Sequence, residues 1–358
     1  MHIPSNPGDG IDSDPARGVL TGPPPDPAST TIPRRPGSAR RTSHIEMSFR
    51  ETGDGPPSLV MTGAARDLAT GSDGSASEHA SAGIEALVDH DHIVRRLDLQ
   101  PHRPSAAALV GRMAGSGFRQ AAREALPDEA AARTPLALLL DDLPVAELIA
   151  GYMNMYDGDS PRRRPSEVTR VDICAGWRSD GTMMTQAAVL GRLPVPFGPT
   201  APDLDHGVAD PVAWHAIAPL PRSTMRRRRL LDVWPDGGAG DLAVHAMFRD
   251  THCQPDGTET VLHEYSLEAR VRDGVITHCV ATPRVLPWVE CPAAAASAGR
   301  LVGMNVNEVR TVVRAEFVGT STCTHLNDLL RSLGDVDVLC QLTSERSADH
   351  RRGGYNHR

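Results

Sequence analysis

A thiol and an imidazole stand two residues apart in the stretch STCTHLNDLL, as Cys323 and His325. The hydroxyl residues before them favour a helix start, and the apolar spacing after them predicts a helix over Thr324–Leu333. A helix N-terminus stabilises a thiolate, which is the form of cysteine that attacks electrophiles and binds metal ions. Because both side chains are able to reach one ion, this corner is the first candidate for chemistry. The alternative is a small buried cysteine beside a surface histidine.

Two further segments carry residues of the same kind. Cys291 directly precedes Pro292 in PWVECPAAAASAG, and proline favours the first helical position, which predicts a helix over Pro292–Val302. His263 shares one face of an alternating strand with Tyr265 in VLHEYSLEARV. Two thiols and one or two imidazoles suit zinc or iron. We therefore expect a zinc or iron site with the ligands Cys291, Cys323, His325 and His263.

Three kinds of function are compatible with this set of residues. A metal ion with an open coordination position would make the chain a metal-dependent enzyme that acts on a small organic substrate. A closed metal site would instead make it a metal or cluster carrier, or an accessory protein. Without a metal, Cys323 would be the catalytic nucleophile of a thiol enzyme, with His263 or His325 as its base. We favour a metal site over the metal-free thiol enzyme, because two separate thiols and a histidine are implicated. The residues do not decide between enzyme and carrier, and the metal-dependent enzyme is our first hypothesis.

The elements that must position these residues occur twice along the chain. Five segments of the first half resemble five segments of the second half in the same order. In the first half they are RRTSHIEMSF, SLVMTGAARD, IEALVDHDHIV, LVGRMAGSGFRQAAREAL and LALLLDDL. Their counterparts are RRRRLLDVW, DLAVHAMFRD, LEARVRDGVI, LVGMNVNEVRTVVRAEF and CTHLNDLL. The sequence therefore predicts an internal duplication, with two diverged copies packed together.

Each copy is predicted to contain antiparallel strands followed by helices, which is an α+β unit with an antiparallel sheet. Period-two alternation and turn residues predict hairpins over Ile84–Leu99 and over Leu262–Val285, the second turning at Asp273-Gly274. A third hairpin is expected over Val171–Val189. Further helices are expected over Ala106–Met113, Phe118–Leu126, Pro135–Met153 and Val306–Phe317.

These elements divide the chain into five parts. The leader over 1–38 is rich in Pro, Gly and Ser and cannot bury enough apolar surface to offset its ordering entropy. The tail over 344–358 has the same character, so both are expected to be disordered. The first repeat covers 39–153, and the second repeat, which carries the Cys/His cluster, covers 226–343. Residues 154–225 would form a hairpin and a Pro/Gly-rich connection.

The duplication supplies an internal comparison for the candidate site. The positions that match Cys323 and His325 are Ala137 and Leu139, and the first copy contains no cysteine. The repeat unit therefore does not need these side chains in order to fold, which favours a functional role for them in the second copy.

Composition argues against several classes of function. The formal net charge is −8, so no basic field indicates a nucleic-acid partner. All 37 residues counted as lysine or arginine are arginine, which rules out a Schiff-base or P-loop lysine. The sequence has no apolar run of membrane-spanning length, no secretory signal pattern and no disulfide-type cysteine spacing. We expect a cytoplasmic protein that acts on a small molecule, without a membrane or nucleic-acid partner.

Two other polar segments have simpler interpretations. VDHDHIV offers Asp89, His90, Asp91 and His92 as metal ligands, but its position predicts a polar hairpin turn. The run Arg226–Arg229 leads into a strand, and we interpret it as a solvated or salt-bridged sheet edge rather than a phosphate site.

The sequence also resembles a bacterial family of unknown function, DUF2889. The resemblance covers roughly Arg40 to Leu339 and rests on RRTSHIEMSF, GAARDL, LLLDDLPVAELIAGY, LHEYSLEARV, ATPRVLPWVECPAAAASAGRLVG and GTSTCTHLNDLLRSL. Shorter members of this family keep a P-x-x-C segment and a C-T-H-L segment. These segments resemble Pro287 and Cys291, with one extra residue of spacing, and the C-T-H-L that begins at Cys323. The family has no established activity, so the resemblance implies none.

Overall fold

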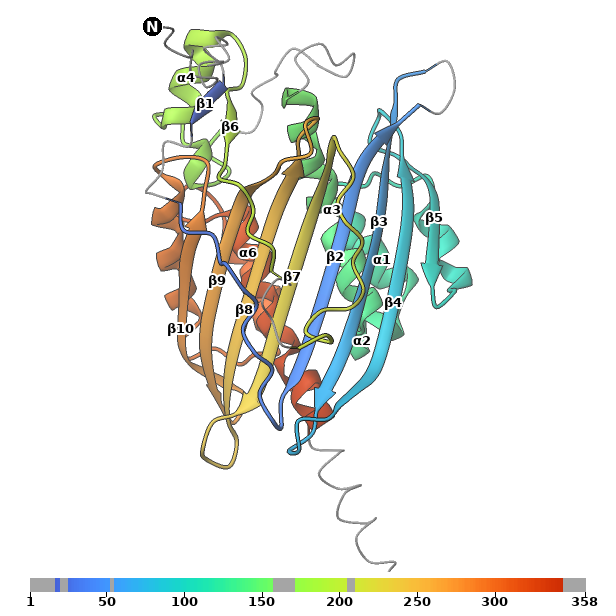
Figure 1. Ribbon diagram of the computed structural model, residues 1–358, viewed down its shortest axis with the longest axis vertical. Coiled ribbons are helices and arrows are strands. Elements are labelled where there is room, and N and C mark those ends of the chain that lie inside the picture. The colour runs from blue at the N-terminus through green and yellow to red at the C-terminus, as the bar shows by residue number, and fades with distance from the viewer. Residues whose placement is uncertain (1–16, 20–24, 52–54, 157–170, 205–209, 344–358) are drawn as a thin grey trace, which may run out of the picture.

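An antiparallel sheet forms the centre of the protein. The computed structural model describes residues 17–19, 25–51, 55–156, 171–204 and 210–343. The sheet has eight strands in the order β10-β9-β8-β7-β2-β3-β4-β5, so β7 and β2 are the central pair (Figure 1). Its strands are β2 (Ala39–Arg50), β3 (Ser58–Thr70), β4 (Ala76–Val88), β5 (Val94–Gln100), β7 (Thr224–Pro235), β8 (Asp241–Cys253), β9 (Glu259–Arg272) and β10 (Val275–Val285).

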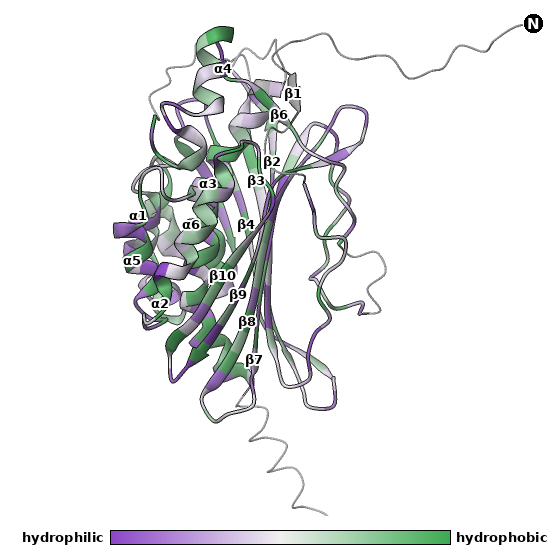
Figure 2. Cartoon of the chain, turned by 90° about the vertical axis from the view of Figure 1, so that its left-hand side faces the viewer, coloured by the Kyte–Doolittle hydropathy of each residue, from purple (hydrophilic) through white to green (hydrophobic). Residues whose placement is uncertain are grey.

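Each group of four strands is followed by its own helices, and these helices cover one face of the sheet (Figure 2). After β5 come η1 (Pro104–Leu109), α1 (Phe118–Ala125), α2 (Pro127–Ala132) and α3 (Pro135–Tyr156). After β10 come η3 (Cys291–Leu301), α5 (Val309–Glu316), α6 (Thr324–Ser332) and η4 (Leu333–Asp335). The α+β architecture with an antiparallel sheet is therefore confirmed. Among the described residues, no helix is both long and apolar enough to cross a membrane.

The expected hairpins β4–β5 and β9–β10 are present, and Asp273 and Gly274 turn the second one with φ of 51° and 77°. Two expected α-helices, over Ala106–Met113 and Pro292–Val302, are instead the 3₁₀ helices η1 and η3. In η3 the buried side chains include Cys291, Ala294 and Ser297, at a spacing of three. A 3₁₀ helix aligns that spacing on one face, so packing against the sheet explains the tighter winding.

The hairpin expected over Val171–Val189 is wrong. Residues Ala175–Trp177 form η2 and Thr182–Leu190 form the helix α4. The Asp180-Gly181 pair resembles a hairpin turn, but the following TMMTQAAVL is rich in good helix formers, and Gly191 ends the helix with a φ of 66°. After α4, the short strand β6 (Val195–Phe197) pairs in parallel with β1 (Arg17–Val19).

Much of the segment expected to be a disordered leader is ordered. Residues 25–38 cross the sheet on the face opposite the helices, beside residues 198–204 and 210–222 (Figure 1). The Ala28 amide donates to Glu264, and Arg34 forms an ion pair with Asp210 at 2.6 Å. Specific polar contacts therefore replace the apolar burial that the composition lacks. Residues 1–16, 20–24 and the tail 344–358 lie outside the described residues, so the prediction for them stays a prediction.

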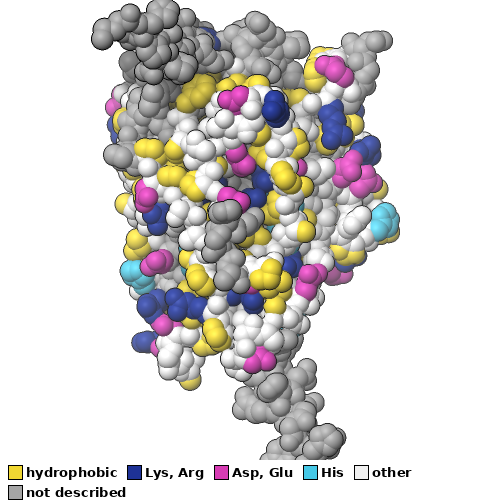
Figure 3. Space-filling model, viewed as in Figure 1, with side chains coloured by type: hydrophobic (Ala, Val, Ile, Leu, Met, Phe, Trp, Pro, Cys, Tyr) yellow, Lys and Arg dark blue, Asp and Glu magenta, His cyan; other side chains and the backbone are white. Residues whose placement is uncertain are grey.

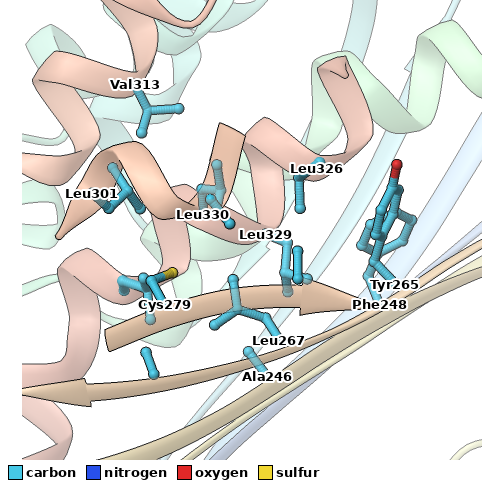
Figure 4. Packing of buried hydrophobic residues seen from close by; sticks show 14 of the residues in the cluster. Ala246, Phe248, Tyr265, Leu267, Cys279, Leu301, Val313, Leu326, Leu329 and Leu330 are labelled. Carbon is cyan, nitrogen blue, oxygen red and sulfur yellow. The ribbon is translucent and has the colours of Figure 1, made fainter. Parts of the chain in front are cut away.

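Figure 3 shows that this face presents hydrophobic, acidic and basic side chains mixed together, rather than one apolar patch. The opposite face of the sheet packs against the helices. Figure 4 shows Leu326, Leu329 and Leu330 of α6 above Ala246 and Leu267 of the sheet. Fully burying one leucine contributes about 1.5–3 kcal/mol, so this contact fixes α6 on β8 and β9.

Four arginines are fully buried in the two central strands, namely Arg40, Arg41, Arg226 and Arg227. The interpretation of Arg226–Arg229 as a sheet edge is therefore wrong. Each buried guanidinium meets a carboxylate: Arg40 pairs with Asp232, Arg41 with Asp67, Arg226 with Glu46 and Arg227 with Asp250. The acids stand on neighbouring strands, so the charge that indicated solvent exposure is neutralised inside the sheet.

Removal of one buried partner tests these pairs. Asp67→Ala leaves the Arg41 guanidinium, which Asp67 contacts through both oxygens at 2.6 and 2.7 Å, with Asp335 as its remaining carboxylate. We expect the free energy of unfolding, measured with urea, to fall by about 3–5 kcal/mol.

The matched control is Asp180→Ala, which removes an exposed two-point pair with Arg178 at 2.9 Å. Because this pair is exposed to solvent, the change should leave the urea midpoint close to that of the natural protein. Equal decreases in the free energy of unfolding for the two variants would contradict the structural role of the buried pair.

A pair of partly buried histidines makes the free energy of unfolding depend on pH. His44 and His215 share a hydrogen bond of 2.7 Å, and burial lowers the pKa of His44 to about 3 and that of His215 to about 4. The pKa of these histidines in the unfolded chain is 6.5. Below that pH the unfolded histidines bind protons that the folded pair does not bind. The free energy of unfolding is therefore at its full value above pH 6.5 and decreases as the pH falls.

We expect each histidine to add up to about 1.4 kcal/mol per pH unit to this loss. The double variant His44→Gln/His215→Gln should show a shallower decline of the urea midpoint between about pH 7 and pH 4.5 than the natural protein. Replacing the exposed His278 by Gln should leave the slope unchanged. An unaltered slope in the double variant would contradict the assignment.

Candidate metal centre

Strands β8 and β9 place Asp250 and His263 directly opposite each other. The register shifts between Asp250 and Thr251, which leaves Leu262 as an extra residue beside His263. Such a bulge re-aims the neighbouring side chains and is frequent near functional sites. His263 lies on the same face of β9 as Tyr265, whose side chain belongs to the core under the helices.

The start of α6 completes this corner. Cys323 is the N-cap residue of α6, and His325 follows in its first turn. The ring of His325 stacks on that of His263 with centroids 3.9 Å apart and an angle of 18° between planes. The Cys323 sulfur lies 3.9 Å from Nδ1 of His325. The side chains of β8, β9 and α6 therefore converge from three elements.

Asp250, His263 and His325 each offer one donor atom within 4.8 Å of the other two. Nδ1 of His263 lies 3.7 Å from Oδ2 of Asp250. Nδ1 of His263 and Nε2 of His325 are buried, and neither has a hydrogen-bond partner among the described residues. Burying a polar atom without a partner is costly, so these two nitrogens are available to bind a ligand such as a metal ion. We call these three residues the Asp–His–His corner.

This donor set fits a divalent transition metal. Two donors bound to one zinc ion at about 2.0–2.2 Å lie roughly 3.3–3.6 Å apart in a tetrahedron, close to the observed spacing of Asp250 and His263. A ligand nitrogen donates in the plane of its ring, so the stacked imidazoles must turn about their side-chain bonds to face one ion. Burial lowers the pKa of His325 to about 3 and that of His263 well below 6.5, which keeps both rings in the neutral form that binds metals.

Arg227 holds the carboxylate of the corner in place. Its Nε and one terminal nitrogen donate to the two oxygens of Asp250 at 2.7 and 2.9 Å, and its other terminal nitrogen donates to Asp328 at 3.0 Å. Asp328 belongs to α6, so one guanidinium ties the strand that carries Asp250 to the helix that carries His325. Partners of this kind orient metal ligands in many proteins.

Cys323 is buried near two further thiols. Burial, followed by the neighbouring Cys174, raises the pKa of Cys323 to about 12, and burial raises that of Cys291 well above 9. The Tyr265 hydroxyl donates to the Cys291 carbonyl at 3.3 Å. Gly176 allows the close packing here, since a Cβ at this position would stand 2.6 Å from the Cys291 sulfur. These thiols are therefore protonated in the absence of a cation.

Of the four expected ligands, His263 and His325 lie in the set of mutually close donors. Cys323 lies outside that set, with its sulfur 3.9 Å from Nδ1 of His325. Cys291 lies in the neighbouring thiol group, outside the set of mutually close donors. Asp250 was not expected. The arginine-rich strand β7 could have indicated it, because buried guanidinium groups require acidic side chains on an adjoining strand.

Asp89, His90 and Asp91 also offer donors within 4.8 Å of one another, but they lie at the surface. Asp89 accepts from the amides of Asp91 and Ile93 and from Arg95, which are the contacts of a polar turn between β4 and β5. The hairpin-turn interpretation of this segment agrees with these contacts.

The fold and the corner define an α+β protein with a partly buried group of metal-type donors. Residues 225–339, which are the later part of the chain, match the family described as "Protein of unknown function (DUF2889)". The match contains Asp250, His263, Cys291, Cys323 and His325. The expected resemblance is thus confirmed, while its expected extent from Arg40 was too long.

No curated protein matches the chain. A solved structure titled "Crystal structure of lipopolysaccharide binding protein" aligns over 87% of this chain and 91% of its own, with 8% sequence identity and a TM-score of 0.14. A TM-score this low carries no argument about fold or function.

The burial of Cys323 leads to a test of its reactivity. In chelator-treated protein at neutral pH, iodoacetamide should modify Cys323 at least about tenfold more slowly than the half-buried Cys340, because a thiol with a pKa of about 12 is almost entirely protonated. Peptide mass spectrometry of the alkylated protein measures both rates. Denatured protein, in which all thiols react alike, is the control. Faster reaction at Cys323 would support a metal-free nucleophile instead.

Proposed function

We propose that the Asp–His–His corner binds a zinc or iron ion and that the protein is a metal-dependent enzyme. The observation that carries this proposal is the pair of buried imidazole nitrogens, on His263 and His325, that have no hydrogen-bond partner and stand beside the carboxylate of Asp250. Two imidazoles and one carboxylate suit iron(II) as well as zinc, since both metals accept this set with positions left open.

Three protein ligands leave room for a further ligand on the ion. An ion held in this way activates a bound water molecule or polarises a small organic substrate. The chain's own residues would bind and orient the ion: Asp250 through a carboxylate fixed by Arg227, and the histidines through nitrogens kept neutral by burial. The apolar surroundings, with Phe248 stacked near His325, would limit access of bulk water.

Two alternatives remain distinct from this proposal. If Cys323 became a fourth ligand, the site would be closed, and a metal carrier or accessory protein would be the better description. A metal-free thiol enzyme is disfavoured by the high pKa of Cys323. The cytoplasmic location that the sequence suggests stays a proposal.

We also propose that the two halves arose by duplication. Each half has four antiparallel strands followed by helices, and the register shifts directly after Asp67 in one half and after Asp250 in the other. At these shifts Asp67 lies opposite Ala80, where Asp250 lies opposite His263. Both acids bind a buried arginine, so the carboxylate serves the fold in both halves, and only in the second half does a histidine lie opposite it.

Metal content tests the proposal. Protein purified under reducing conditions without chelator should contain about one zinc or iron ion per chain by mass spectrometry. His263→Gln and His325→Gln should each lower the affinity more than about tenfold, because each removes a ligand. His278→Gln, on the exposed face of β10, is the matched control and should keep the metal.

Thermal unfolding of each variant separates loss of metal from loss of fold. The proposal would be contradicted if the natural protein contained no metal and also failed to take up added zinc or iron. It would also be contradicted if both histidine variants retained the full metal content. With cobalt(II) as a probe, a sulfur charge-transfer band that disappears in Cys323→Ser would favour the closed carrier site over the open catalytic one.

A further inference from the structure

A cleft lined by arginines lies among the helices, away from the Asp–His–His corner. It occupies about 230 Å³ between α1, α2 and α3 of the first half and α5 of the second. The acidic residues in its lining are Asp141 and Glu129. The arginines in its lining are Arg119, Arg123, Arg133, Arg310 and Arg314. The chain as a whole has a net charge of −8, so this excess of positive charge is local.

The acids of the cleft do not neutralise these arginines. Asp141 is shared by four guanidinium groups, at 3.4 Å from Arg119, 3.5 Å from Arg310, 3.7 Å from Arg314 and 3.3 Å from Arg331. Glu129 is already bonded to Arg103 at 2.6 Å, outside the cleft. Arg119 and Arg310 have second carboxylate partners outside the lining of the cleft, in Asp328 and Asp335, but Arg314 has only its share of Asp141 among the described residues.

Several donors in the cleft are unused. Within the described part of the chain, neither Arg123 nor Arg314 has a carboxylate within hydrogen-bonding distance, and Arg123 donates only to Gln120. Nε of Arg310 is buried without a partner, although its terminal nitrogen bonds to Asp335 at 2.8 Å. Burial and the neighbouring Arg123 lower the pKa of Arg314 to about 10, which is the sign of cations held close together without enough anions.

We propose that this cleft binds the phosphate group of a small organic phosphate. Arg123, which has no ion pair among the described residues, and Arg314, whose carboxylate Asp141 is shared with three other arginines, match the two charges of a phosphate monoester. Arginine donors also match phosphate oxygens in geometry. The floor of the cleft is apolar, with Ala122, Leu126 and Leu138 buried beneath the arginines. Such a floor suits the organic part of the ligand.

Calorimetric titration of the full chain, with and without metal, tests this proposal. The ligands are phenyl phosphate and inorganic phosphate, with sodium chloride at matched ionic strength as the reference. We expect saturable binding of phosphate that chloride does not reproduce. Tighter binding of phenyl phosphate identifies an organic phosphate as the ligand, while equal affinity identifies free phosphate.

Arg314→Gln and Arg123→Gln should each raise the dissociation constant about tenfold, because each removes a charged hydrogen-bond donor. Both side chains are partly exposed, so both variants should fold. The matched control Arg112→Gln removes one exposed guanidinium outside the cleft and should change the constant less than about twofold. Absence of saturable phosphate binding, or equal weakening by Arg112→Gln, would overturn the proposal.

Discussion

The buried ion pairs of β2 and β7 are the constraint on which the rest of the structure depends. Arg227 and Asp250 are 1% and 0% exposed, so neither charge is solvated, and each requires the other. A shift of one residue along either strand would turn these side chains to the opposite face and leave them unpaired. Apolar packing alone tolerates many registers, whereas buried charges with fixed partners tolerate one. The central strands therefore align the two groups of four strands with respect to each other.

The same pairs position the candidate metal centre. Arg227 joins Asp250 of β8 to Asp328 of α6, and Asp328 in turn bonds Arg331 one turn later in the same helix. This network sets the height of α6 above the sheet, and leucine packing sets its rotation. His325, in the first turn of α6, then meets His263 on β9. The fold would need these ion pairs even without a metal, which explains why the carboxylate of the corner has an equivalent in the first half and the histidines do not.

The sequence was informative where structure is local. Glycine and aspartate at 273–274 predict the turn of β9–β10, and the hydroxyl residues before Thr324 predict the start of α6. The sequence was misleading where the interacting residues are distant along the chain. Arg226–Arg229 resembles a solvated edge, because its acids lie on other strands and no spacing along the chain reveals them. For the same reason Asp250 escaped notice, while Cys291 and Cys323, which the sequence offered as ligands, both lie outside the close donor set. The order of residues 25–38 depends on contacts such as that of Ala28 with Glu264, which composition does not indicate.

Charge balance decides what Cys323 contributes to the corner. Arg227 already neutralises Asp250, so a divalent cation between Asp250 and two neutral imidazoles would find little net negative charge. The nearest additional source is the Cys323 sulfur, 3.9 Å from His325, whose ionisation burial suppresses in the absence of a cation. A bound cation reverses that suppression, because it stabilises the thiolate directly. If the corner binds a metal as proposed, Cys323 would respond to that ion rather than act alone as a nucleophile, and its protonation would be coupled to the occupancy of the corner.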